Sequence, residues 1–142
     1  MKREHFSLTT VPAGDTPAAP DVPTLRITYS GNASVLQERL TDAEGSPLDG
    51  ADVDVAFRKR EGETGVLSIA ERLTGTFIAE LEADIAAVEQ VIEAAEADDD
   101  RYRVEIVIDD DHVTFEKQTL LVYETTGQLL RSRSLIPGSV EL

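Results

Sequence analysis

Cysteine is absent from this 142-residue sequence, and so is tryptophan. Without cysteine the chain cannot form disulfides, thiolate metal sites or thiol nucleophiles. The sequence also lacks any apolar run long enough to cross a bilayer. The segment Met1–His5 is charged and leads into no apolar run, so we expect no secretory signal.

Basic residues are scarce: 13 lysines and arginines stand against 28 aspartates and glutamates, which gives a net charge of −15. Such a surface repels nucleic-acid phosphates and anionic membranes, so we expect neither as a direct partner. Lysine occurs only as Lys2, Lys59 and Lys117. This composition resembles that of proteins from extreme halophiles, in which carboxylates stay hydrated and molar salt screens their repulsion. An ordinary acidic protein from a low-salt cell is the alternative.

Signatures of catalysis are also missing. The two histidines, His5 and His112, are far apart in the sequence, and neither belongs to a motif with metal-ligand spacing. No nucleophile elbow, P-loop or dinucleotide fingerprint occurs, and residues 62–65 are typical of an ordinary turn. We therefore expect no catalytic residue, no cofactor and no enzyme activity.

Clusters of aspartate are the pattern that comes nearest to a metal site. The runs 98–100 and 109–111, and separately Asp49, Asp52 and Asp54, bring together the oxygen ligands that Ca²⁺ prefers. None has the glycine and terminal glutamate of an EF-hand loop, and such clusters are expected on any strongly acidic surface. We predict no metal site, and a structural cation is the alternative.

Alternation of apolar and polar residues predicts a mainly β chain. The clearest example is 51–58, where two valines and a phenylalanine share one face of a half-buried strand. Similar short runs recur at 25–29, 34–40, 66–73, 76–81, 102–108 and 113–123. The aspartates at 109–111 predict a hairpin turn, and a phase slip predicts a bulge near 117–119. We expect a two-sheet β-sandwich or a small β-barrel.

One segment, about 80–97, breaks this alternation. Leu81, Ile85, Val88 and Ile92 are spaced four, three and four residues apart, which places them on one stripe of a helix. Alanine and glutamate, both good helix formers, fill most of the other positions. We expect one α-helix inserted into the β domain, and its stripe must cover either its own sheet or a neighbouring subunit.

Residues 1–24 are rich in proline, which removes amide donors and favours extended backbone. We expect an extended arm here, outside a β domain at 25–125. Within the arm, Phe6 and Leu8 alternate as they would in a segment that adds to the sheet edge of a partner. A disordered tail is the alternative.

Residues 126–142 are predicted to be a C-terminal strand and tail. Arg131 and Arg133 would share one face of a strand and could pair with acids on a neighbouring subunit. The alternative is an ordinary edge strand guarded by cations. Because this segment is the least acidic part of the chain, a contact role is favoured.

The segment 42–53 resembles the D-x-x-G-x-P turn and following strand of the immunoglobulin-like domain in structural proteins of tailed viruses, notably baseplate upper proteins of siphophages. Residues 75–77, 102–105 and 121–123 are similar to later strands of that domain. The sequence departs from the pattern by inserting the helix at 80–97 and by lacking a glycine before its penultimate strand. The resemblance implies an immunoglobulin-like sandwich.

Together with the halophile-like composition, the resemblance implies a virion protein of a tailed virus that infects haloarchaea, made in the host cytoplasm. It would be a ring-forming neck or head–tail connector (a stopper) or a baseplate subunit. The alternatives are a capsid decoration protein and an immunoglobulin-like module that binds carbohydrate or a cell surface. Its partners would be other virion proteins and copies of itself, in a ring or lattice. The expected contact residues are Phe6, Leu8, Leu81, Ile85, Val88, Ile92, Arg131 and Arg133.

Overall fold

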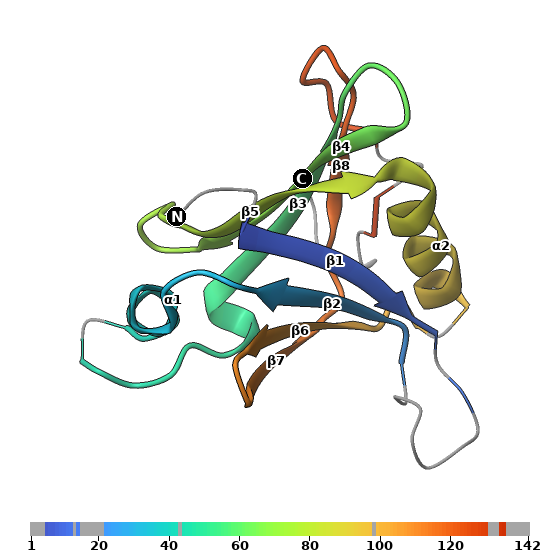
Figure 1. The fold of residues 1–142 in the computed structure, drawn as a ribbon. Coiled ribbons are helices and arrows are strands. Elements are labelled where there is room, and N and C mark those ends of the chain that lie inside the picture. Colours follow the sequence, from blue (N-terminus) through green and yellow to red (C-terminus); the bar gives the residue numbers. More distant parts are fainter. Residues whose placement is uncertain are drawn as a thin grey trace.

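The computed structural model describes residues 5–12, 14, 22–42, 44–97, 99–130 and 134–135. In these residues eight strands form two sheets of four strands each (Figure 1). The strands are β1 (Phe6–Val11), β2 (Thr24–Tyr29), β3 (Val53–Lys59), β4 (Thr64–Glu71), β5 (Phe77–Asp84), β6 (Tyr102–Ile108), β7 (Asp111–Lys117) and β8 (Leu121–Tyr123). The helical segments are α1 (Ala33–Arg39), the 3-10 turn η2 (Gly50–Asp52) and α2 (Ile85–Glu96).

The first sheet has the strand order β1-β2-β6-β7, and the second has the order β5-β4-β3-β8. Neighbouring strands are antiparallel except for β2 with β6 and β3 with β8, which are parallel. The hairpin predicted around 109–111 is confirmed as the β6–β7 pair. Over the described residues the two sheets do not close into a barrel, so the prediction of a mainly β, two-sheet sandwich is confirmed. No helix in this part of the chain is long and apolar enough to span a membrane.

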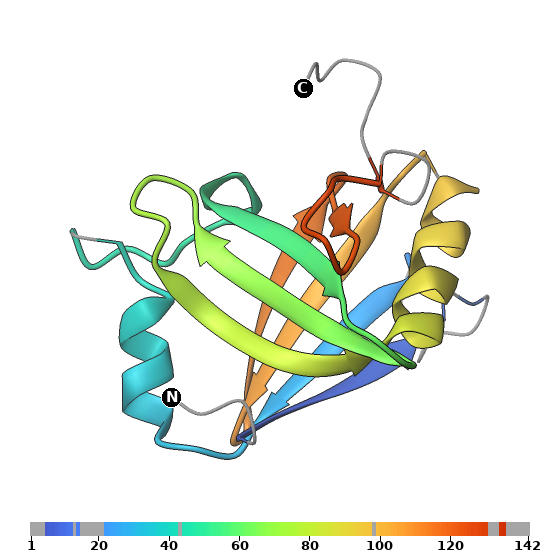
Figure 2. The ribbon, with the colours of Figure 1, turned by 90° about the horizontal axis from the view of Figure 1, so that it is seen from above.

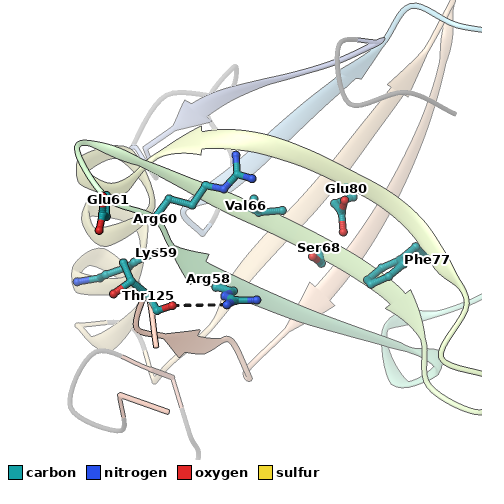
Figure 3. A pocket seen from close by; sticks show the side chains of 9 residues that line it. All are labelled: Arg58, Lys59, Arg60, Glu61, Val66, Ser68, Phe77, Glu80 and Thr125. Carbon is teal, nitrogen blue, oxygen red and sulfur yellow. Dashed lines mark hydrogen bonds between the residues drawn. The ribbon is translucent and has the colours of Figure 1, made fainter. Parts of the chain in front are cut away.

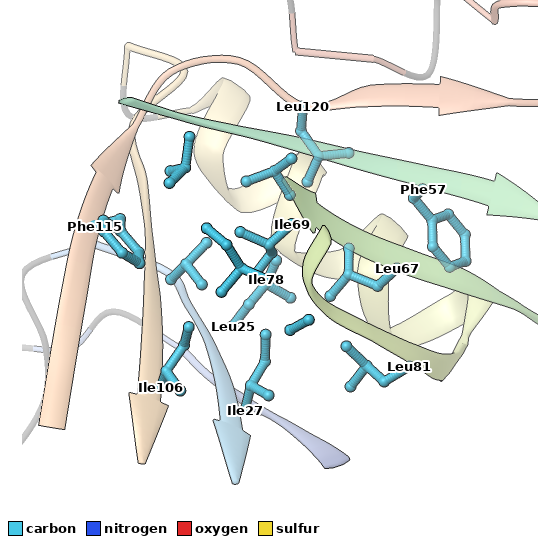
Figure 4. Close-up of a cluster of buried hydrophobic side chains, with 14 of the residues drawn as sticks. Leu25, Ile27, Phe57, Leu67, Ile69, Ile78, Leu81, Ile106, Phe115 and Leu120 are labelled. Carbon is cyan, nitrogen blue, oxygen red and sulfur yellow. The ribbon is translucent and has the colours of Figure 1, made fainter. Parts of the chain in front are cut away.

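Alternating apolar residues give both sheets an inner face, and the two faces form one core. In the first sheet Ile27 lies beside Ile106 across the parallel β2–β6 pair, and in the second Phe57 lies beside Leu67. All four side chains are fully buried, and Figure 4 shows them between the two layers. The period-two pattern therefore predicted which side of each of these strands faces the core.

The two α-helices lie at opposite ends of the sandwich (Figure 2). Val88, Val91, Ile92 and Ala95 of α2 are buried and belong to the same core as the strands. The apolar stripe therefore covers the chain's own sandwich, which was one of the two alternatives that the sequence left open.

The helix α2 begins later than the predicted segment 80–97. Residues up to Asp84 belong to β5, where Leu81 pairs with Leu67 of β4. The sequence around 77–84 satisfies the strand pattern as well as the helical one, and pairing with β4 decides for the strand.

Two aspartates end α2 through their backbone conformation. Asp99 and Asp100 have φ angles of 57° and 63°, in the left-handed region. The amide of Asp100 donates to the carbonyl of Ala95 at 2.8 Å. A hydrogen bond back to the last turn from a left-handed residue is a common way for a helix to stop.

The run at 34–40 forms α1 and a turn, so the strand predicted there is wrong. The side chain of Asn32 caps the helix by accepting from the amide of Ser34 at 3.0 Å and from its hydroxyl at 2.7 Å. Leu36 and Leu40, four residues apart, are both buried in the core. The cap and this spacing both favour a helix, and seven residues are too few for the alternation to be decisive.

Residues 6–11 form β1 and do not project as an arm, which corrects that expectation for this segment. β1 pairs antiparallel with β2, and the ring centroids of Phe6 and Tyr29 lie 4.8 Å apart. Phe6 is buried and Leu8 packs against the core. The segment therefore adds to a sheet edge of its own chain, because its alternating apolar side chains complete the chain's own core. Residues 15–21 lie outside the described part of the chain.

Between Lys117 and Leu121 the chain passes from the first sheet to the second. The bulge predicted at 117–119 is therefore wrong, because the phase slip marks a crossover between sheets. The register shift that the structure does contain lies between Ile69 and Ala70, in the β4–β5 pair.

Candidate interaction surface

The structure places most of the predicted contact residues against the chain's own core. Phe6, Leu81, Val88 and Ile92 are buried, and Leu8 and Ile85 pack against the core while partly exposed. Arg131 and Arg133 lie outside the described residues. An apolar side chain that is packed in the core offers little area to a partner. Any contact surface within the described chain therefore consists mainly of other residues.

Lys117 is a buried cation that joins the two sheets. Its Nζ donates to the carbonyl oxygens of Gly50 and Val53, both at 2.7 Å. Burial lowers the pKa of this lysine and the nearby Arg72 lowers it further, while two nearby aspartates raise it. Because both acceptors are backbone carbonyls of η2 and β3, the residue ties β7 to the other sheet.

Tyr102 is a buried phenol on β6. Its hydroxyl donates to the carbonyl of Thr119 at 2.6 Å, and burial raises its pKa well above the ordinary value. A phenol with a raised pKa stays protonated at neutral pH, so it acts as a hydrogen-bond donor. This bond holds the crossover after β7 against the core.

Asp49, Asp52 and Asp54, which lie before and at the start of β3 and could be calcium ligands, have protein partners. Asp49 accepts from the amide of Ala51 at 2.9 Å, and Asp52 accepts from the amide of Asp49 at 3.0 Å. Asp54 pairs with Arg72 at 2.8 Å. No group of three or more side chains suited to a metal ion occurs among the described residues. These three carboxylates stabilise the turn into β3 and its outer face.

A hollow of about 630 Å³ lies over the outer face of the second sheet (Figure 3). Its lining includes Arg58 and Arg60 from β3 and the loop that follows it. Val66 and Ser68 contribute from β4, and Phe77 from the beginning of β5. With Lys59, Glu61 and Glu80, the hollow therefore combines three cations, two carboxylates, an aromatic ring and small polar side chains.

The register of the second sheet explains why its outer face is hollowed. Ala56 of β3 pairs with Ser68 of β4, which pairs with Glu80 of β5. In the next row out, Arg58 pairs with Val66. Small side chains thus occupy the middle of this face, and longer side chains surround them.

Arg58 and Arg60 at the hollow form no ion pair with a described carboxylate. Arg58 donates to the carbonyl of Thr125 at 3.5 Å, and the guanidinium of Arg60 forms no hydrogen bond or ion pair with any described residue. Lys59 lies between them in sequence and reaches Glu89 of α2 at 3.5 Å. Other arginines of the sandwich pair with carboxylates. Positive charge is therefore left at this hollow in a chain that is otherwise strongly acidic.

Large exposed apolar side chains gather at one end of the sandwich. In the described residues these are Phe77 (50 % exposed), Leu73 in the β4–β5 turn (91 %) and Val35 on α1 (38 %). A second hollow, of about 410 Å³, lies between α1 and this turn and is lined in part by Val35 and Ile78. Arg39 of α1 donates to the carbonyl of Phe77 at 3.0 Å. Phe77 therefore lies between the two hollows.

A sequence signal for this surface exists, and the sequence reasoning missed it. Residues 58–60 are the longest run of consecutive basic residues in the chain. In a sequence with so few cations, such a run indicates a local exception to the acidic surface.

The exposure of Phe77 has no such signal. The strand predicted at 76–81 puts Phe77 in phase with Leu81, on the core face. The register shift next to Ala70, the partner of Phe77, breaks that alternation, and Ile78 takes the buried position. A bulge re-aims side chains in this way, and it depends on pairing that a single strand does not reveal.

Comparisons with known proteins assign a family. No curated protein and no solved structure matches the chain. A family profile matches residues 1–142, its full length. The protein therefore belongs to DUF5793, a family of unknown function.

Proposed function

We propose that this protein is a non-catalytic assembly module that joins copies of itself through the apolar end of its sandwich. The observation that carries the proposal is the gathering of Val35, Leu73 and Phe77 around α1 and the β4–β5 turn. Single apolar side chains on a surface need no explanation, but a group of them beside a hollow is typical of a contact site.

A contact at this end would remove the Phe77 ring from water. Burial of apolar area stabilises an interface by about 25 cal/mol per Å² before the costs of association are counted. Aromatic side chains that become fully buried near the centre of an interface often supply much of its binding energy. The hydrogen bond from Arg39 fixes the backbone of Phe77, so little order has to be imposed on it when a partner binds.

The setting that we propose is the virion of a tailed virus that infects haloarchaea, as a neck or head–tail connector ring or as a baseplate subunit. It is supported by the resemblance of 42–53 to the immunoglobulin-like domain of such viral proteins. The excess of 28 acidic over 13 basic residues supports a high-salt cell. Other virion proteins would be its further partners, and decoration of a capsid is the second placement.

Sedimentation velocity over a range of protein concentrations tests the proposal, in about 1 M KCl to screen the net charge. We expect the unmodified protein to form oligomers and the double variant Leu73→Ser, Phe77→Ser to sediment as a monomer. Val107→Ser is the matched control, because Val107 is partly exposed on the outer face of the other sheet.

The control should associate as the unmodified protein does. A protein that stays monomeric at every concentration and salt would overturn self-assembly. Oligomers that the double variant leaves intact would show that the apolar end is not the contact.

A further inference from the structure

We infer that the association is head-to-tail: the hollow with Arg58 and Arg60 on one copy receives the acidic β6–β7 turn, Asp109–Asp111, of the next copy. The inference rests on the proposed self-assembly. Phe77 belongs both to the apolar end and to the lining of this hollow. The inference adds the acidic turn that meets the hollow on the next copy and the symmetry that their contact creates.

The basic surface is suited to a ligand that carries carboxylates. Arg58 and Arg60 point their charge at a hollow in which no described acid forms an ion pair with them. Guanidinium groups bind carboxylates through parallel N–H donors. Glu61 and Glu80 also line the hollow, so its lining carries three cations and two carboxylates. The hollow therefore keeps a small excess of positive charge on a strongly acidic chain.

The acidic surface is the longest run of exposed carboxylates without a partner among the described residues. Asp109, Asp110 and Asp111 are all exposed, and none of their side chains forms a hydrogen bond or ion pair with a residue that the structure describes. Other acids on the sheets, such as Asp54 and Glu116, pair with arginines. The φ of 53° at Asp109 tightens the turn. A narrow acidic tip of this kind can enter a hollow of about 630 Å³.

The two surfaces belong to different sheets of the same copy. The hollow faces away from the core on the second sheet, whereas the turn ends the β6–β7 hairpin of the first sheet (Figures 1 and 3). A contact between unlike surfaces is heterologous and leaves one of each free after every addition. It produces a ring when the rotation closes and a filament when it does not.

Repulsion between the net charges of two copies opposes this contact, whereas pairing of the arginines with the aspartates favours it. Two bodies of net charge −15 repel each other through the solvent. The Debye length falls from about 10 Å at 0.1 M salt to about 3 Å at 1 M, whereas pairs that become partly buried are screened much less. We therefore expect association to strengthen as KCl is raised from about 0.1 M towards 1 M.

Two complementary variants test the inference by sedimentation velocity and native mass spectrometry. The first, Arg58→Glu with Arg60→Glu, removes the basic surface. The second, Asp109→Asn with Asp110→Asn and Asp111→Asn, removes the acidic one, and asparagine tolerates the left-handed φ at 109. Each variant keeps one intact surface. We expect each alone to be a monomer, with a dissociation constant at least about tenfold weaker, and an equimolar mixture to form a dimer with one copy of each.

The controls make substitutions of the same kind elsewhere in the sandwich, with one arginine and two aspartates changed. Arg103→Glu alters an arginine on the outer face of the first sheet, and Asp99→Asn with Asp100→Asn alters two other aspartates with positive φ, of which Asp99 is exposed and Asp100 is partly buried. Both controls should associate as the unmodified protein does. Thermal melting by circular dichroism checks that every variant folds. If the glutamate pair does not fold, Arg58→Gln with Arg60→Gln replaces it with the same expectation.

The outcomes separate this inference from the proposed function. Oligomers that persist in both surface variants overturn the inference and leave self-assembly standing. Variants that are monomeric alone and remain monomeric when mixed also overturn it, because a heterologous contact must restore one interface. An unmodified protein that never associates overturns both.

Discussion

Lys117 of the first sheet and Val53 of the second are joined by a hydrogen bond of 2.7 Å from the lysine ammonium to the backbone carbonyl. A second bond reaches the carbonyl of Gly50, where an added Cβ would approach the carbonyl oxygen of Glu116 to 2.5 Å. The β7 edge of the sandwich is thus closed by a buried cation and close backbone packing. Apolar contacts alone do not account for it.

Replacing Lys117 by methionine removes both bonds while keeping the length of the side chain. We expect the free energy of unfolding to fall by roughly 1.5–3 kcal/mol, the range for a hydrogen bond to a charged group. Urea unfolding measures the change. Lys59→Met is the control, because its ammonium reaches Glu89 at 3.5 Å in a partly exposed pair, for which a change of about 0–1 kcal/mol is expected. Equal losses in the two variants would contradict the role given to Lys117.

The lowered pKa of Lys117 makes a prediction about alkaline pH. Between the folded pKa and the ordinary value of 10.5, the unfolded state binds more protons than the folded state. The free energy of unfolding contributed by this group therefore rises with pH in that window, as the cost of burying the charge is relieved. As pH rises towards 10.5 through that window, the unmodified protein should gain stability relative to Lys117→Met. A difference that stays flat with pH would mean that the ammonium is not desolvated.

The raised pKa of Tyr102 predicts that the free energy of unfolding falls at higher pH, opposite to the trend expected from Lys117. Its folded pKa is raised above the ordinary 10.0, so its contribution is fully present below pH 10 and is lost as pH rises further and the unfolded phenol ionises. Tyr102→Phe should remove this loss, and it should cost about 1 kcal/mol at neutral pH through the missing bond to Thr119. Urea unfolding of both proteins at neutral pH and above pH 10 measures the two effects. Tyr123→Phe is the control, since Tyr123 is only partly buried. If Tyr102→Phe loses stability with pH as steeply as the parent, the phenol is not the cause.

Much of the fold follows from the sequence because a half-buried strand shows its period directly. The segments 53–59 and 102–108 alternate without interruption, and both occur as strands with the expected core face. The helix at 85–96 was predicted because its stripe is long enough to separate a period of 3.6 from a period of 2. A short segment does not separate the two periods, which is why the strand predicted at 34–40 is wrong.

Pairing between strands could not be read from the sequence. Nothing in 6–11 says that it pairs with its own β2 and not with a partner's sheet, because both arrangements need the same alternation. The candidate surface depends on pairing as well. The cations at 58–60 are visible in the sequence, but the exposed ring of Phe77 results from a register shift on the neighbouring strand. Sequence patterns describe one strand at a time, whereas the hollow belongs to three of them.

The excess of acidic residues predicts that salt stabilises the fold. A net charge of −15 makes the folded state repel itself, and salt screens that repulsion. Salt also weakens surface ion pairs such as Arg103–Glu116, at 2.7 Å, but exposed pairs of this kind contribute only about 0–1 kcal/mol each. Repulsion summed over the whole chain should therefore outweigh them, and the melting temperature should rise steadily from low salt to about 2 M KCl. Calorimetry measures it, with sucrose at equal osmolality as the control for excluded-volume effects. If the melting temperature falls or stays constant in KCl, the acidic surface is not an adaptation to salt.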